Sequence, residues 1–173
     1  MVGETVSGIA EIQRGLEGCR AANVEMDRPF HLALLAEAYL CGAKPNEALS
    51  ALDEAFAMVR DSRAFFYEAE LYRLRGNALR QAGDEFLQAA DTSLQHALEV
   101  ARRYGTHPLE LRAAVSLARL WREQGKHREA RELLSDVSAK FTGASSTPDL
   151  VEAHAILKEL GAGARTLRAD SSL

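Results

Sequence analysis

The chain has 173 residues, of which 47% are apolar and 27% are charged, with 21 Lys and Arg against 25 Asp and Glu. A chain of this length can bury a sizeable core in one domain, and this composition excludes an intrinsically disordered chain. No stretch approaches the roughly 18 uncharged apolar residues of a membrane span. The amino end has no basic segment typical of a secretion signal. The mildly acidic balance argues against a nucleic-acid binder that uses its whole surface, although it leaves room for a local basic stripe. We expect neither a membrane nor a nucleic acid as partner.

The cysteine content points to a reducing compartment. Cys19 and Cys41 are the two cysteines, and neither belongs to a C-x-x-C pair or has a histidine at ligand spacing. A zinc site is therefore not expected. We expect two buried or half-buried thiols in a cytoplasmic protein.

Every periodic stretch of the sequence has a helical period. β-branched residues are sparse, and no run alternates apolar with polar residues, so strands have little support. Proline stands where helices would begin, and glycine stands where they would end. The glycines expected to close helices are Gly42, Gly83, Gly105, Gly125 and Gly161. The sequence predicts an all-α protein of about eight helices, over residues 5–23, 28–41, 45–60, 63–82, 84–104, 107–124, 127–141 and 148–160.

A pattern of small, large and small residues at i, i+4 and i+7 recurs along these helices. Its copies are Gly8, Ile12 and Gly15; Ala48, Leu52 and Ala55; Ala90, Leu94 and Ala97; and Ala130, Leu134 and Val137. They follow one another at offsets of 40, 42 and 40 residues. The alternate helices carry a second pattern at the same offsets, in Leu35, Ala36 and Tyr39, in Arg75, Gly76 and Leu79, and in Leu117, Ala118 and Trp121. Because Gly in mid-helix costs about 1 kcal/mol against Ala, Gly76 indicates a crossing too close for a methyl group.

A repeated helical hairpin of this kind predicts an α-solenoid, since one hairpin cannot bury its own apolar faces. The pattern resembles the tetratricopeptide repeat, whose usual period is about 34 residues. Two departures are that Arg75 stands where the repeat has Leu, and that Arg60 and Arg102 replace its closing Pro. We expect one domain over residues 1–160, made of an unpaired second helix (5–23), repeats at 28–60, 63–104 and 107–141 and a capping helix (148–160), followed by a flexible tail (161–173).

Longer sequence segments show a more specific resemblance to a known family, and it extends over residues 8–160. The segments 31–39, 68–76, 109–121 and 147–153 resemble the C-terminal helical repeats of large bacterial regulators that contain cyclase or DNA-binding domains and P-loop ATPase modules. The resemblance implies a regulatory interaction module, and it does not carry cyclase or ATPase activity to this chain. We also expect a shortened or partial solenoid, in which the flank of helix 5–23 that lacks a partner favours self-association.

The sequence contains few motifs that indicate catalysis or ligand binding. It has no P-loop, no G-x-G-x-x-G and no H-E-x-x-H, G-x-S-x-G or EF-hand motif. Its five histidines fall on five different expected helices or caps. We therefore expect no enzyme, no cofactor and no metal site.

The surface with a predicted function is a groove lined by the first helix of each hairpin. Arginines gather toward its carboxyl end, where guanidinium groups would favour carboxylates or phosphates. The predicted groove residues are Phe30, Glu37, Glu70, Arg73, Asn77, Arg80, Arg112, Arg119 and Arg122. Arg73 and Asn77 resemble part of the carboxylate clamp of chaperone-binding tetratricopeptide domains, but Ser116 stands where that clamp needs Arg. The alternative is that these arginines are solvated or paired with acids such as Glu70 and Glu123.

Three functions remain open at this point. The first is a non-enzymatic module that binds a protein or peptide, acidic peptides included, in the groove, as part of a larger signalling or ATPase regulator. The second is a sensor segment whose groove takes a small ligand and relays its presence to an ATPase or cyclase domain. The third, an independent enzyme or a nucleic-acid binder, has the least support, because a shallow solenoid seldom offers a deep polar pocket.

Overall fold

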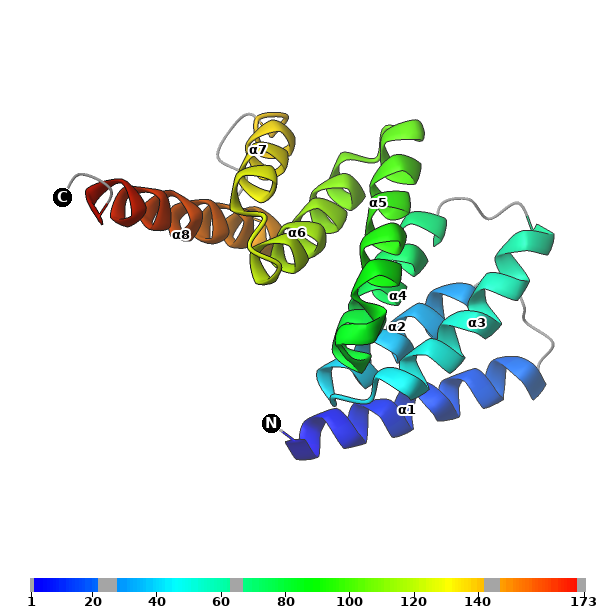
Figure 1. The fold of residues 1–173 in the computed structure, drawn as a ribbon. Helices are drawn as coiled ribbons and strands as arrows, with labels where there is room; N and C mark the ends of the chain where they lie inside the picture. Colours follow the sequence, from blue (N-terminus) through cyan, green and yellow to red (C-terminus); the bar gives the residue numbers. More distant parts are fainter. Residues whose placement is uncertain (1, 22–27, 63–66, 142–146, 171–173) are drawn as a thin grey trace. The chain divides into compact units, whose positions relative to one another are not determined.

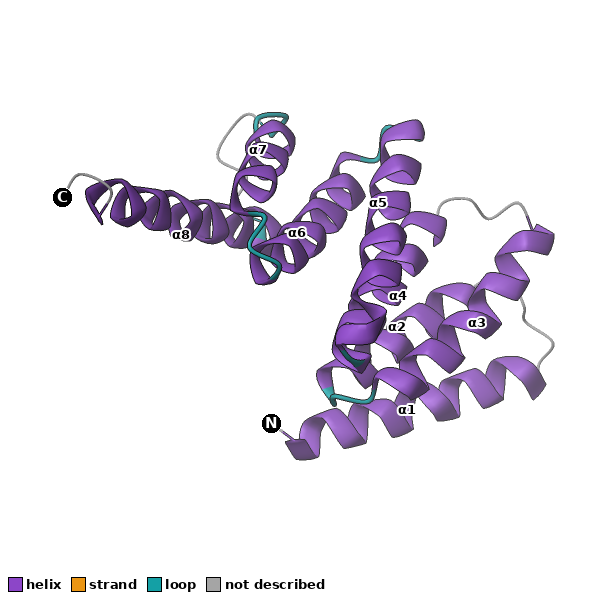
Figure 2. Cartoon of the chain, in the orientation of Figure 1, coloured by secondary structure: helices purple, strands orange, loops and turns teal. Residues whose placement is uncertain are grey.

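The computed structural model describes residues 2–21, 28–62, 67–141 and 147–170. These residues form eight α-helices and one turn of 3-10 helix, joined by short connections (Figure 1). Figure 2 shows no strand in this part of the chain. The elements are α1 (Val2–Ala21), α2 (Arg28–Cys41), α3 (Pro45–Ser62), α4 (Glu68–Ala82), η2 (Asp84–Phe86), α5 (Leu87–Arg103), α6 (His107–Glu123), α7 (His127–Ser138) and α8 (Pro148–Asp170).

The predicted all-α class and the number of helices are confirmed. The largest difference lies at the carboxyl end, where α8 continues to Asp170 and the sequence predicts an end at Leu160. Gly161 does not stop the helix, because Ala and Arg after it are strong helix formers and no proline follows. Residues 161–170 therefore continue α8, and the predicted boundary was wrong there.

The chain divides into two compact units, Met1–Val100 and Ala101–Leu173. The first unit holds α1 to α4 and most of α5, and the second holds the end of α5 with α6 to α8. The predicted single domain over residues 1–160 stays a prediction. Each unit is described by itself below.

In the first unit, the recurring small and large residues form the packing surfaces of the hairpins. Helices α2 and α3 pack together, α3 packs on α4, and α2 also contacts α4, so that one hairpin stacks on the next. The two predicted stripes are completely buried, on α3 by Ala48, Leu52 and Ala55 and on α5 by Ala90, Leu94 and Ala97. The stacking that the repeats predict is present within this unit.

The second unit repeats the same arrangement with α6 and α7 as its hairpin. Helix α8 packs on both, as the first helix of a further hairpin would. The stripe of Ala130, Leu134 and Val137 on α7 is completely buried. Helix α8 buries Leu150, Ala153, Ile156 and Leu160 on one side. A free-standing α8 would expose this side, so its apolar residues hold it against the hairpin.

Helix α1 agrees only partly with the repeat pattern. Its apolar stripe packs on α2, with Ile9 and Leu16 buried and Ile12 and Cys19 half-buried. Gly8 and Gly15 were aligned with the small residues of the later stripes, yet a Cβ at either position would have no neighbour within 4 Å. These two glycines therefore do not mark a close helix crossing. They share the spacing of the later stripes without sharing their packing role.

Three helix ends share one hydrogen-bonding pattern. Each has a residue of positive φ followed by an amide that reaches back across the last turn. Gly105 (φ 64°) and Gly125 (φ 76°) hold this position after α5 and α6, as predicted. After α2 the position belongs to Ala43 (φ 53°) and not to Gly42, so the predicted closing residue was wrong by one. The Lys44 amide donates to the Tyr39 carbonyl at 2.9 Å there.

The two cysteines differ in exposure. Cys19 is half-buried, as predicted, but Cys41 is exposed. Cys41 is the last residue of α2, five positions after Ala36, the last buried residue of that helix. The prediction for Cys41 was wrong because an apolar neighbourhood in sequence does not fix burial at a helix end.

Candidate functional site

The first unit presents an apolar patch beside an ionic network on helices α2 and α4. Phe30 and Leu34 lie one turn apart on α2, and they are 42% and 37% exposed. The Phe30 ring lies 6.0 Å from the ring of Tyr67, which directly precedes α4. Large apolar side chains that are exposed together, such as Phe30 and Leu34, are a common feature of protein-binding surfaces.

Arg73 forms the centre of the ionic network. Its Nε and Nη2 donate to both carboxylate oxygens of Glu70, at 2.8 and 2.7 Å, and Nη2 also donates to Glu37 of α2 at 3.2 Å. Arg73 is 8% exposed. Burial alone would lower the pKa of this guanidinium, but the two carboxylates outweigh burial and raise the pKa. Arg73 therefore joins α2 to α4, and it is already engaged by carboxylates of its own chain.

We call the surface formed by Phe30, Leu34, Glu37, Tyr67, Glu70 and Arg73 the α2–α4 face. Asn77 and Arg80 continue the stripe of Arg73 along α4, and both are half-buried. The Gln81 side chain also reaches α2, where it donates to the Leu40 carbonyl at 3.4 Å. All six predicted groove residues of the first unit thus lie on one pair of adjacent helices.

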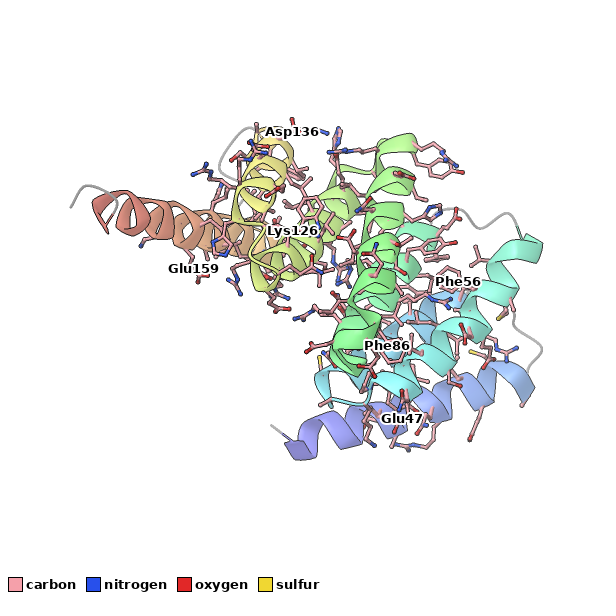
Figure 3. All side chains as sticks on the ribbon, viewed as in Figure 1. Glu47, Phe56, Phe86, Lys126, Asp136 and Glu159 are labelled. Carbon is pink, nitrogen blue, oxygen red and sulfur yellow. The ribbon has the colours of Figure 1, made fainter. Side chains whose placement is uncertain are left out.

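The three predicted groove residues of the second unit form ion pairs between α6 and α8. Arg112 Nε lies 3.9 Å from Asp149 Oδ1, Arg119 pairs with Glu152, and Arg122 pairs with Glu159. Figure 3 shows Glu159 on α8. The order of the pairs shows that α6 and α8 run in the same direction. Each arginine keeps about a third or more of its side chain exposed.

These pairs change the predicted electrostatics of the second unit. The sequence predicts a basic wall, but three carboxylates of α8 balance the three guanidinium groups of α6. The acids lie 33 to 37 positions away in sequence, so helix periodicity alone could not pair them. The alternative of internally paired arginines describes Arg112, Arg119 and Arg122 better than a free basic stripe. A common groove formed with the α2–α4 face stays a prediction.

A buried acid in the second unit was missed by the sequence analysis. Glu110 is 1% exposed, and it accepts hydrogen bonds from Arg102 at 2.8 Å and from Lys140 at 2.7 Å. His107 Nδ1 lies 3.5 Å from its other oxygen. Burial raises the pKa of Glu110, but the bonds from Lys140 and Arg102 outweigh it and hold the pKa below its ordinary value.

Glu110 joins three elements. Its donors come from the end of α5, the first turn of α6 and the residues after α7. The available signal was an acid on the face of α6 that also carries Ala113, Ala114 and Leu117. Both oxygens are engaged by groups of the protein, so the Glu110 side chain links the three elements.

The described residues contain no group of three or more His, Cys, Asp or Glu placed to hold a metal ion. In the same part of the chain no helix has the length and apolar character needed to cross a membrane. The partial resemblance of Arg73 and Asn77 to a carboxylate clamp gains no support, because Ser116 is buried and Arg73 is held by Glu70 and Glu37.

The sequence and the structure were compared with those of known proteins. Residues 67–141 match the model of the tetratricopeptide repeat. A crystal structure of nearly identical TPR-like repeats, from a Podosopora anserina protein described as a kinesin light chain, superposes with a TM-score of 0.66 at 20% identity. The match covers 98% of this chain and 90% of the other chain. No curated protein matches the sequence significantly. The chain therefore has the fold of a tetratricopeptide-like α-solenoid, and its residues 67–141 carry the sequence pattern of that repeat.

Proposed function

We propose that the chain is a non-enzymatic module that binds a protein segment on its α2–α4 face. Tetratricopeptide repeats generally mediate protein–protein interaction. The observation that carries the proposal is the exposed pair of Phe30 and Leu34 beside the network of Glu37, Arg73 and Glu70. An apolar anchor next to oriented charged groups provides both affinity and direction for a bound peptide.

The internal ion pairs support one kind of partner over another. Because Arg73 already binds two carboxylates, an acidic peptide would have to replace Glu37 or Glu70 at a cost in free energy. Glu37 keeps 43% of its side chain exposed, so it can accept a hydrogen bond from a partner without leaving Arg73. The face therefore favours a segment with one large apolar side chain and nearby polar or basic groups. The arginines of α6 remain candidates for weaker contacts with carboxylates.

Peptides selected from a random library against the whole chain provide a direct test. We expect the selected sequences to share one apolar anchor position and to bind Phe30→Ala at least about tenfold more weakly, as truncation of an interface anchor commonly does. Phe86→Ala is the matched control, because Phe86 is 40% exposed but lies in η2, outside the α2–α4 face. Its affinity should stay within about twofold of the unchanged chain.

Equal loss of affinity in the two variants would contradict the proposal. So would selected peptides that bind Phe30→Ala as tightly as the unchanged chain. Charge reversal at Arg73 is a poor test of binding, because it would bring three acids together and destabilise α2 against α4. Leu34→Ser offers a second, exposed substitution on the same face, and its thermal stability should remain close to that of the unchanged chain.

The proposal extends to a regulatory role within a larger signalling or ATPase regulator. Its support is the resemblance of segments 31–39, 68–76, 109–121 and 147–153 to the repeats of such regulators. The gene sequence tests this role. A cyclase, DNA-binding or P-loop ATPase domain encoded in the same reading frame would support it, and a reading frame that encodes the repeats alone would contradict it.

A further inference from the structure

We propose that a cavity between α1, α2 and α3 binds a small organic cation with an apolar body, such as an alkylammonium or arylalkylammonium ion. The cavity has a volume of about 390 Å³. That volume falls in the range of about 300–1,000 Å³ typical of small-molecule sites. Helix α1 packs on α2 and α3 forms a hairpin with α2, so all three walls belong to the first unit.

The floor of the cavity is apolar. Leu16 of α1, Leu32 and Leu35 of α2 and Ala51 of α3 line it, and each is at most 7% exposed. Since these side chains are packed into the core on their other sides, they form a preformed surface that needs no rearrangement to receive a ligand. An apolar group of a ligand that is buried against this floor would leave water, and this transfer favours binding.

The rim of the cavity is acidic. Glu17 of α1 and both Glu47 and Glu54 of α3 line it, and no Lys or Arg does. Arg28 pairs with Glu54 at one end. Glu17 and Glu47 are exposed, and the part of the chain that the structure describes contains no ion-pair partner for either. Figure 3 shows Glu47 at the start of α3. Within the described residues these two carboxylates lack an ion-pair partner, so the rim above the apolar floor favours a positively charged ligand and disfavours an anion.

An aromatic side chain provides a second, independent reason for a cation. Tyr39 lines the cavity from α2, and its hydroxyl accepts a hydrogen bond from Gln13 Nε2 of α1 at 2.9 Å. This bond joins the half-buried Tyr39 side chain to α1. The face of an aromatic ring attracts ammonium groups, because its π electrons carry partial negative charge. The apolar floor, the acidic rim and the aromatic side chain therefore all favour an organic cation with an apolar body.

The cavity is distinct from the α2–α4 face. None of the residues that form that face lines the cavity. The proposal therefore does not depend on the proposed function, and each can fail without the other.

Three compounds with one carbon skeleton test the charge preference. Phenylpropylammonium, phenylpropanol and phenylpropanoate are titrated against the whole chain, with binding followed by NMR shifts of the methyl groups of Leu16, Leu32 and Leu35. We expect saturable binding of the ammonium ion, at least about fivefold tighter than the alcohol, and no binding of the carboxylate. Absence of any binding at millimolar concentration would overturn the proposal. Equal affinity for the alcohol and the ammonium ion would overturn its claim for a cation.

Variants locate the binding on the cavity. The double change Glu17→Gln and Glu47→Gln should weaken the ammonium ion about three- to tenfold, since each exposed charge pair contributes a factor of a few. Glu11→Gln removes the same charge from an exposed position of α1 that does not line the cavity, and it should change the affinity less than twofold.

Ser50→Trp fills the cavity from the exposed side of α3 and should abolish binding. A cooperative thermal transition near that of the unchanged chain shows that each variant is folded. Retained affinity in Ser50→Trp, or an equal effect of Glu11→Gln and the double variant, would overturn the assignment to this cavity.

Discussion

Gly76 lies so close to Leu94 that a β-carbon at Gly76 would stand 2.5 Å from Leu94 Cγ and 3.1 Å from the Ala90 carbonyl oxygen. The crossing joins α4 to α5 at the centre of a repeat. Leu94 and Ala90 are completely buried, so neither can move away without disturbing the core. The glycine is a requirement of helix packing, as the sequence predicts.

Gly76→Ala should therefore destabilise the chain. The new methyl group gains about 1 kcal/mol of helix propensity, but overpacking costs about 1–3 kcal/mol, and the buried contact with Leu94 decides the sign. Gly76→Leu should cost more. Urea unfolding measures both changes. Gly15→Ala is the control, because its Cβ would meet nothing within 4 Å. It should stabilise the chain by up to about 1 kcal/mol, and the same sign at both sites would contradict the packing account.

Ala43→Gly should stabilise the chain. Ala43 holds a φ of 53°, and an L-residue in this left-handed conformation loses about 1–2 kcal/mol that glycine does not lose. The greater freedom of glycine in the unfolded chain offsets part of this gain, which leaves a net effect of about 0.5–1 kcal/mol. Gly105→Ala, at φ 64°, should show a loss of similar size. Denaturation midpoints of the two variants that move in the same direction would refute the prediction.

Removal of the charge of Glu110 should destabilise the second unit in a pH-dependent way. Glu110→Gln keeps the shape but weakens the bonds from Lys140 and Arg102, with an expected cost of about 1–3 kcal/mol near neutral pH. Because the folded-state pKa of Glu110 is lowered, this stability is present above the unfolded pKa of about 4.3 and is lost as the pH falls through the folded pKa.

The two unfolding curves measured between neutral pH and pH 3 should therefore converge as the acid protonates. A difference that is constant over that range would show that the contribution of Glu110 does not depend on its charge. Glu132→Gln is the control, since Glu132 is exposed on α7 and its distance to Arg128 is 4.0 Å.

Arg73 and Arg122 should differ in their contributions to stability. Arg73→Met leaves Glu37 and Glu70 facing each other beside a mostly buried position, so we expect a loss of about 1–3 kcal/mol. Arg122→Met removes one half-exposed pair with Glu159 and should cost less than about 1 kcal/mol. Equal losses in thermal unfolding would mean that the burial of Arg73 does not strengthen its ion pairs.

The part of the fold that could be predicted from the sequence is the part set by local helical periodicity. The stripes at Ala48, Ala90 and Ala130 identified the packing faces because small residues recur wherever helices cross closely. Gly76 could be interpreted for the same reason, since a glycine in mid-helix needs a cause. The sequence could not show that Ala43 closes α2 or that α8 passes Gly161, because both depend on small differences in backbone free energy.

The candidate site was less predictable, because the two partners of its interhelical ion pairs lie on helices that are far apart in the sequence. Arg112, Arg119 and Arg122 share one face of α6, as predicted, but their partners on α8 are set by the stacking of the hairpins. Glu110 was missed for the same reason, since two of its donors come from neighbouring elements. The cavity beside α1 is formed by side chains from three helices, so no local sequence pattern could predict it.

Amide shift mapping by NMR tests the account most directly, with the whole chain titrated by a peptide selected from the random library. The account predicts the largest shifts in α2 and α4, around Phe30, Leu34 and Glu37, and around Tyr67 and Arg73, with much smaller shifts in α3 and α7. Shifts confined to α3, α5 or α7 would place the partner on the second helices of the hairpins and would contradict the central claim.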